Sequence, residues 1–328
     1  MSKELKQSES YFKDSQIIWD AHSCLPLSGN EPLSVIQRHK EAGYDYVSIN
    51  IGMDKQSADQ IFATLNRFRN YIQNESSICT LVGNITELHK AKAAGLLAIS
   101  FDLEGLQGIA HDLSLLSPLY DLGLRQVALA YNQNNSLCGG CLNPDVGLTK
   151  LGRESIQLAN NLGLLLDCSH ISHQASLEVM TLSEQPVIFS HANPAALKKH
   201  PRNLSNQQIL TCARQGGVIG VNGIGILLGD NCSDTELWHK HFKYLIDLVG
   251  WQHVGIGLDH CYSTTEMSNF AAENPVICQP YKKLKMVCPE QLDELISMFS
   301  VQGYSVQEIE GILGDNFQRV AAQVWNNN

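Results

Sequence analysis

Nine short, nearly continuous apolar runs recur along the chain, and they constrain its fold more than any other feature of the sequence. Runs without alternating polar residues are typical of parallel strands that are buried on both faces. We therefore predict strands at 17–21, 46–51, 78–82, 96–101, 126–130, 164–167, 187–189, 217–221 and 254–258.

Helical patterns fill most of the connections between these runs. The pair Asn193-Pro194 places a capping residue before a proline at the first helical position, so it predicts a helix directly after His191. The other predicted helices rest on an apolar face, a capping residue or a closing glycine. They are 32–42 with Asn30 as a cap, 58–71, 149–162 before Gly163, 172–182, 290–299 and 305–324.

Strand and helix alternate over about 250 residues without a break in composition, which is typical of an eight-stranded (β/α)₈ barrel of the TIM type. A doubly wound open sheet is the alternative. One of the nine runs is then spare, and we expect it to be 78–82. We predict a single barrel domain over 1–328, in which the long segment 261–289 is a loop or lid over the barrel mouth.

Charge and composition exclude several classes of partner. The formal net charge of −10 argues against nucleic acid and against an anionic membrane, because both attract basic surfaces. The N-terminus lacks the apolar core of a signal peptide, and no run approaches the roughly 20 apolar residues of a membrane span. We therefore expect a cytoplasmic protein whose ten cysteines are reduced.

Two of the apolar runs end in the same dipeptide, Ser169-His170 and Ser190-His191, with one helix-length segment between them. In a parallel α/β protein this puts two imidazoles at neighbouring strand ends, on the face where barrel enzymes keep their active sites. Imidazole and carboxylate ligands suit Zn²⁺ or a similar divalent ion, so the sequence predicts a metal site. The polar residues expected on this face are His22, Cys24, Glu104, Tyr131, Asn132, His170, His191, Asn222 and Asp259.

This arrangement resembles the membrane (renal) dipeptidase family of metallopeptidases, peptidase family M19, which belongs to the amidohydrolase-like barrels. The resemblance runs from Asp20 to Val320, and the order and spacing of the motifs agree throughout. The matching motifs are Asp20-Ala-His22, Asp102-Leu-Glu104-Gly105, GLTKLGRESIQLANNLGLLLDCSHIS at 147–172, PVIFSHANPAAL at 186–197, Arg202-Asn203, VGIGLD at 254–259 and Gly314-Asp-Asn-Phe-Gln-Arg-Val320.

The resemblance implies a role for each ligand. His22 would bind one metal ion, Glu104 would bridge two ions, and His170 and His191 would hold the second. Two nearby cations lower the pKa of a bridging water towards ~7 and polarise the scissile carbonyl. Asp259 could then take the proton from that water and pass it to the leaving amine.

The resemblance also implies which residues bind the substrate. Arg202 matches the arginine that grips the substrate carboxylate, a task that suits a planar bidentate donor. Tyr131 stands where the family usually carries a histidine that stabilises the oxyanion, and a tyrosine hydroxyl can donate a hydrogen bond there. We expect Asn132 to face the substrate as well.

One departure from the family pattern falls on a metal ligand. Where the family usually has His-x-Asp, this chain has His22-Ser23-Cys24. A thiolate binds Zn²⁺ at about 2.3 Å, so Cys24 is a candidate ligand; it is equally compatible with a site that has lost a metal ion. One or two zinc ions are expected. After the last strand, Asp259-His260-Cys261 replaces the usual aspartate, aromatic, aspartate.

The sequence therefore predicts a metal-dependent hydrolase that cleaves the peptide bond of dipeptides with a metal-activated water. Two alternatives stay open: a single-metal hydrolase of another small amide or lactone, and a catalytically degenerate barrel that binds an amino-acid derivative through Arg202. The expected partner is a small-molecule substrate, and the family resemblance alone suggests a homo-oligomer.

Overall fold

Eight parallel strands close into a barrel in this computed structural model, which describes residues 11–27, 31–281 and 283–325. The strands pair in chain order, and β1 pairs with β9 through Asp20 and Ile256, which closes the ring. This confirms the predicted barrel over the open sheet. The barrel strands are β1 (Trp19–Cys24), β2 (Tyr46–Met53), β4 (Leu97–Glu104), β5 (Leu124–Ala128), β6 (Leu165–Asp167), β7 (Ile188–Ala192), β8 (Val218–Val221) and β9 (Val254–Ile256).

The spare run is the one expected from the sequence. It forms β3 (Cys79–Leu81), which pairs with the first half of β4, from Leu97 to Ile99. The pairing of β4 with β5 starts only at Phe101, so β3 occupies the edge of β4 that β5 leaves uncovered. A short strand that the sequence did not reveal, β10 (His260–Cys261), extends the sheet beside the end of β1.

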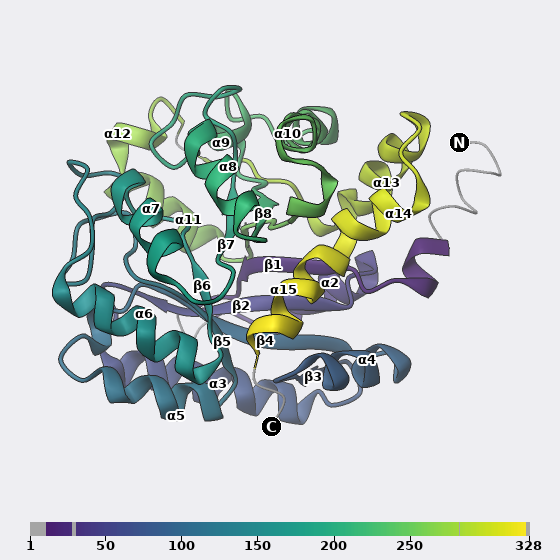
Figure 1. The fold of residues 1–328 in the computed structure, drawn as a ribbon. Helices are drawn as coiled ribbons and strands as arrows, with labels where there is room; N and C mark the ends of the chain where they lie inside the picture. The colour runs from purple at the N-terminus through teal and green to yellow at the C-terminus, as the bar shows by residue number, and fades with distance from the viewer. Residues whose placement is uncertain (1–10, 28–30, 282, 326–328) are drawn as a thin grey trace.

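Helices pack around the outside of the strands (Figure 1). Among the described helices, none is both long and apolar enough to cross a bilayer. Short 3₁₀ turns lie at Leu33–Ile36, Gln107–Ile109, Leu113–Leu115, Trp251–His253 and Pro289–Gln291. The α-helices are α2 (Gln37–Ala42), α3 (Ala58–Asn74), α4 (Ile85–Ala93), α5 (Leu116–Asp121), α6 (Lys150–Leu162), α7 (His173–Leu182), α8 (Asn206–Arg214), α9 (Gly225–Leu228), α10 (Thr235–Val249), α11 (Thr264–Glu273), α12 (Pro275–Cys278), α13 (Leu292–Val301), α14 (Val306–Glu310) and α15 (Asn316–Val324).

Capping side chains set several of these helix starts. The Ser57 hydroxyl accepts a hydrogen bond from the backbone N–H of Gln60, whose side chain accepts from the Ser57 N–H in return, and this capping box begins α3. Thr149 and Ser172 cap α6 and α7 in the same position, and Gly163 ends α6 with a φ of 79°. The predicted cap Asn30 lies outside the described residues.

The helix predicted at Asn193-Pro194 is wrong. The segment forms a turn, because Pro194 makes a parallel bridge to Leu204 and the Asn193 carbonyl accepts a hydrogen bond from the Leu204 N–H. The Asn193 amide donates to the carbonyl of Asn222 and so does not cap a helix. Tertiary contacts at both ends of the segment therefore override its local capping signal.

The segment 261–289 contains α11 and α12 where the sequence showed no clear period. Apolar residues of this segment pack against Ile224, Ile226 and Leu227, which follow β8. Its function as a lid stays a prediction. The predicted C-terminal helix also has an interruption, because a π-helical turn at Gly311–Asp315 separates α14 from α15.

An aromatic cluster fills the barrel at the N-terminal ends of β1 and β2. The rings of Trp19 and Tyr46, the first residues of these two strands, stack with centroids 3.7 Å apart. Phe317 from α15 lies over Trp19 at 6.1 Å, and it is only 1% exposed. The last helix thus closes the end of the barrel opposite to the strand ends that carry the candidate site.

We expect Phe317→Ala to lower the free energy of unfolding by about 3–5 kcal/mol, because it removes a large buried ring from this cluster and leaves a cavity. Equilibrium denaturation measures the change. Val301→Ala, at a position that is 71% exposed, is the control and should change stability by no more than about 0.5 kcal/mol. An equal loss in both variants would contradict the closing role of α15.

Candidate metal centre

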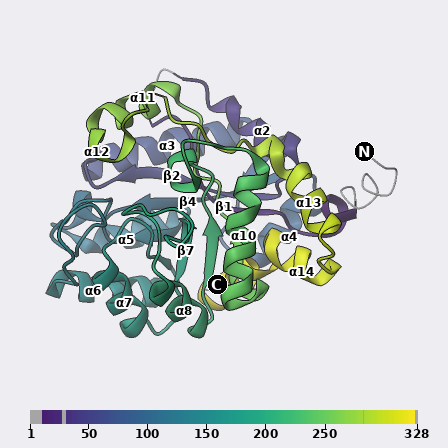
Figure 2. The ribbon, with the colours of Figure 1, turned by 90° about the horizontal axis from the view of Figure 1, so that it is seen from above.

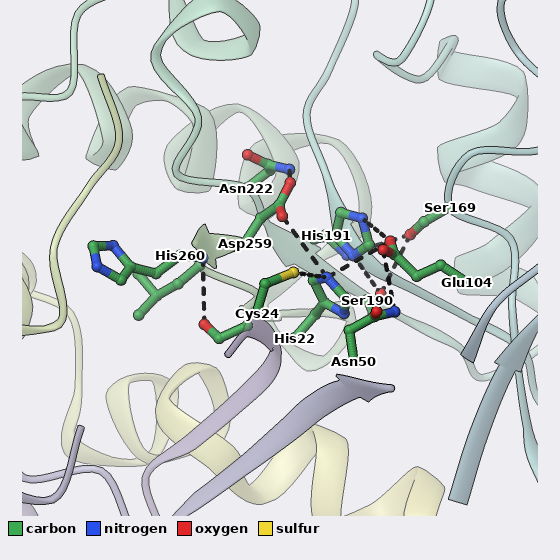
Figure 3. Close-up of polar contacts among 12 residues, drawn as sticks. His22, Cys24, Asn50, Glu104, Ser169, Ser190, His191, Asn222, Asp259 and His260 are labelled. Atoms are coloured by element: carbon green, nitrogen blue, oxygen red, sulfur yellow. Dashed lines mark hydrogen bonds and ion pairs between the residues drawn. The ribbon is translucent and has the colours of Figure 1, made fainter. Parts of the chain in front are cut away.

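The C-terminal ends of the barrel strands bring the predicted ligands together. His22 and Cys24 lie in the last three residues of β1, Glu104 ends β4, and His191 lies in β7. His170 and Asp259 follow β6 and β9 by three residues each. Figure 3 shows the side chains of His22, His191, Glu104 and Asp259 turned toward one another from these separate strands.

Glu104 lies at the centre of the group. Its Oε1 atom is 2.7 Å from His170 Nε2, 3.3 Å from His191 Nε2 and 3.6 Å from His22 Nε2. Three imidazoles therefore turn the same ring nitrogen toward one carboxylate oxygen.

Neighbouring acceptors fix the tautomer of His170 and His191. His170 Nδ1 lies 2.8 Å from Asn132 Oδ1, and His22 Nδ1 lies 3.2 Å from Asp102 Oδ1. His191 Nδ1 lies 2.7 Å from the Ser190 hydroxyl, which itself donates to Asp167 and so must accept from the imidazole. In His170 and His191, Nδ1 therefore carries the hydrogen of the neutral ring, and Nε2 presents a lone pair.

These lone pairs face each other closely. His170 Nε2 and His191 Nε2 are 2.7 Å apart, with Glu104 Oε1 beside both. Two lone pairs and an ionised carboxylate oxygen repel one another at these distances, and a proton or a cation among them relieves the repulsion; Arg202 Nη2 lies 3.3 Å from His170 Nε2. Buried imidazole nitrogen and carboxylate oxygen are also the ligands that Zn²⁺ accepts, so the donor set fits a metal ion.

The electrostatics of the pocket agree with this fit. Burial lowers the pKa of His170 and His191 well below the usual value, and the charge of Arg202 lowers both further. Burial raises the pKa of Glu104 to about 8, and Asp259 and Asp102 add to the rise. A metal ion binds the neutral form of imidazole and the ionised form of a carboxyl group. These two histidines are already neutral, and a divalent cation would stabilise the ionised form of Glu104 that burial disfavours.

His22 connects this group to a second set of donors. Its Nε2 atom is 3.5 Å from Cys24 Sγ and 3.7 Å from Asp259 Oδ1, and ligand atoms of these three residues all lie within 4.8 Å of one another. Burial lowers the pKa of His22, but Asp102 and Glu104 outweigh it, so the pKa is raised well above its usual value. Burial also raises the pKa of Cys24. A cation here would displace both protons.

Arg202 and Tyr131 border the same space. The Arg202 guanidinium is buried, donates from Nη2 to the His191 carbonyl at 3.1 Å, and forms no ion pair with a carboxylate of the described residues. The rings of Tyr131 and His170 are 4.4 Å apart. Burial raises the pKa of the Tyr131 phenol, and the nearby Glu104 raises it further, so the hydroxyl remains a donor.

Asn132 lies behind His170. Its amide oxygen is 2.8 Å from His170 Nδ1 and 3.3 Å from the Cys141 thiol. Asn132 thus orients His170, a candidate metal ligand, and its contact with the substrate stays a prediction. Asn222, also expected on this face, donates from Nδ2 to Asp259 Oδ2 at 2.8 Å and so holds that carboxylate in place.

Three residues at the site have left-handed backbone, which non-glycine residues rarely adopt. Their φ angles are 62° at Asn132, 69° at His170 and 54° at Asp259. All three lie where a strand has just ended, and such strain is typical of functional sites.

The sequence assigned no role to the carboxylates behind the candidate ligands, although Asp102 is part of a matching motif. Asp102 accepts hydrogen bonds from Ser48 and Asn50 while it faces His22, and Asp167 accepts from the backbone N–H groups of Ser169 and Ser190. Both aspartates lie within or at the end of an apolar run, and this signal could have identified them, because a buried carboxylate requires a hydrogen-bond or charge partner.

Comparisons with known proteins agree with this geometry. The family model described as membrane dipeptidase (peptidase family M19) matches residues 35–328. A protein named uncharacterized dipeptidase from Schizosaccharomyces pombe is 33% identical over 175 residues, which are 50% of this chain and 42% of that protein. Dipeptidase verJ from Clonostachys rogersoniana is 29% identical over 191 residues, 57% of this chain and 49% of that protein. The matched parts thus span less than half the length of these curated relatives.

Solved structures share the fold. An amidohydrolase from Pseudomonas aeruginosa superposes with a TM-score of 0.89 at 21% identity, over 97% of this chain and 99% of that chain. A metallopeptidase from Rhodobacter sphaeroides, liganded with a phosphinate mimic of the dipeptide L-Ala-D-Ala, superposes with a TM-score of 0.78 at 19% identity, over 95% of this chain and 100% of that chain.

Proposed function

Because the chain belongs to the membrane dipeptidase family (peptidase family M19), we propose that it is a metal-dependent dipeptidase that hydrolyses the peptide bond of dipeptides. The observation that supports this most is the convergence of three histidine Nε2 atoms on Glu104 Oε1. The buried Arg202 guanidinium beside them, which forms no ion pair with a carboxylate of the described residues, offers a place for the substrate carboxylate.

Zinc is the proposed ion, because the donors combine imidazole, carboxylate and thiol. His170 and His191 would hold one ion, His22 and Cys24 would hold another, and Glu104 would bridge them. Bound there, zinc would polarise the scissile carbonyl and lower the pKa of the attacking water.

Side chains of the protein bind the substrate, stabilise the developing charge and transfer the proton. Arg202 binds the C-terminal carboxylate of the dipeptide and so fixes the amide over Glu104. The Tyr131 hydroxyl donates a hydrogen bond to the carbonyl oxygen as negative charge develops on it. Asp259, held by Asn222, accepts the proton of the attacking water and delivers it to the leaving amine. A homo-oligomer is also proposed, and it rests on the family resemblance alone.

Protein purified without chelator is expected to contain zinc and to release free amino acids from a dipeptide such as Ala-Ala. Treatment with a strong chelator should abolish hydrolysis, and added Zn²⁺ should restore it, because the metal ion would polarise the scissile carbonyl and activate the water. Elemental analysis and amino-acid detection measure the two quantities, and circular dichroism checks that the chelated protein stays folded. Full activity in the metal-free protein, or none in the reloaded protein, would contradict the proposal.

A further inference from the structure

A cavity of about 640 Å³ borders the candidate site, and its lining includes His170 but not Glu104, His191 or His22. His170 and Arg202 form its inner wall. Its other walls come from the loop after β5, the segment 195–205, and the first turns of α7 and α8. These two helices lie side by side, and the Gln208 amide of α8 donates to Ser176 of α7 at 2.9 Å (Figure 2).

The groups around this cavity are mostly positive. The N-terminal ends of α7 and α8 both point to it, since their capping residues Ser172 and Ser205 line the wall. Arg202 and Lys199 add two full charges. Asp145 is the acidic residue of the lining, and its carboxylate already accepts a hydrogen bond from the backbone N–H of Gln174 at 2.8 Å.

Lys199 differs from its neighbour on the same loop. Lys198 is outside the cavity lining and forms an ion pair with Asp230 at 2.8 Å. Lys199 lines the cavity, is exposed, and forms no hydrogen bond or ion pair with the described residues. The loop that carries both is fixed, because the Asn203 amide donates to the Lys198 carbonyl at 2.8 Å and to the Leu227 carbonyl at 2.9 Å.

We propose that this cavity is a subsite for an anionic side chain, so that the enzyme favours dipeptides whose C-terminal residue is aspartate or glutamate. This rests on the proposed dipeptidase function. With the α-carboxylate of that residue on Arg202 and the scissile amide over Glu104, its side chain reaches the space that Arg202 and Lys199 share. Lys199 is then a specificity-determining residue.

The test compares Ala-Asp with Ala-Asn, whose side chains have nearly the same shape and differ in charge. Zinc-loaded wild-type protein should have a higher kcat/KM for Ala-Asp. Lys199→Glu should lower kcat/KM for Ala-Asp by about tenfold, through a lost attraction and a new repulsion, and should leave Ala-Asn within about twofold. Lys198→Glu makes the same change of charge one residue away and should leave both peptides unchanged.

Equal effects of Lys199→Glu on both peptides, or an equal effect of Lys198→Glu on Ala-Asp, would overturn the subsite while leaving the dipeptidase function intact. If the loaded wild-type protein cleaves neither peptide, the proposed function is wrong. Calorimetric titration of the same peptides then decides about the subsite. Tighter binding of Ala-Asp that Lys199→Glu removes would support it, and equal affinities would overturn it.

Discussion

Replacing His170 and His191 together with alanine is expected to abolish bound zinc and to reduce dipeptide hydrolysis by more than about 100-fold. The two Nε2 atoms lie 2.7 Å apart, and in the proposed centre they are the two imidazole ligands of one metal ion. Loss of an outer partner of a ligand costs metal affinity 10–100-fold by itself, so loss of two ligands should exceed that range. Elemental analysis gives the metal content and amino-acid release gives the rate.

The fold should survive this change, because the aromatic cluster around Trp19 and Phe317 lies at the other end of the barrel. A cooperative thermal unfolding transition checks this. His89→Ala, at an exposed position on α4, is the matched control and should keep its zinc. Unchanged metal content in the double variant would remove both histidines from the metal centre.

Substitutions of Cys24 test how many ions the proposed centre holds and with what ligands. Cys24→Asp restores the carboxylate that the family usually has there, so it should keep or raise metal content and dipeptidase rate. Cys24→Ala removes the donor and should lower the metal count and weaken the affinity of one position by at least about 10–100-fold. The thiolate is a soft ligand, so the wild-type protein should hold zinc or cobalt in preference to magnesium.

Cobalt gives a readout that does not depend on activity. Wild-type protein loaded with Co²⁺ should show a near-ultraviolet charge-transfer band from a sulfur ligand, and Cys24→Asp should lack it. Cys261→Ser is the control, since Cys261 pairs in register with Cys24 on the adjacent strand and lies outside the candidate ligand groups. If no Cys24 variant changes metal content, rate or spectrum, Cys24 is not a metal ligand, and the ion next to His22 is bound without it.

The barrel could be predicted because parallel strands buried on both faces leave a sequence signal that needs no knowledge of their neighbours. Even the spare run was identifiable, although its place along the first half of β4 was not. A helix was wrongly predicted after His191, where the structure has a turn, because the conformation there depends on distant residues. Asn193-Pro194 is a strong local helix start, but the bridge from Pro194 to Leu204 depends on residues ten positions away.

The ligands at the strand ends could be predicted in the same way, because a parallel barrel gathers them on one face. Their orientation could not. Whether His191 presents Nε2 or Nδ1 depends on the Ser190 hydroxyl and on Asp167, which belongs to a different strand. The cavity beside Arg202 was also out of reach, since it depends on how the loops after β5 and β7 meet.

The left-handed residues at Asn132, His170 and Asp259 have an evolutionary consequence. Glycine adopts that backbone at the lowest cost, so selection for stability alone would place glycine at all three positions. We propose that the larger side chains persist at these positions because the function of the site requires them. A descendant that loses the activity should therefore drift toward glycine at these strand ends and gain stability as it does so.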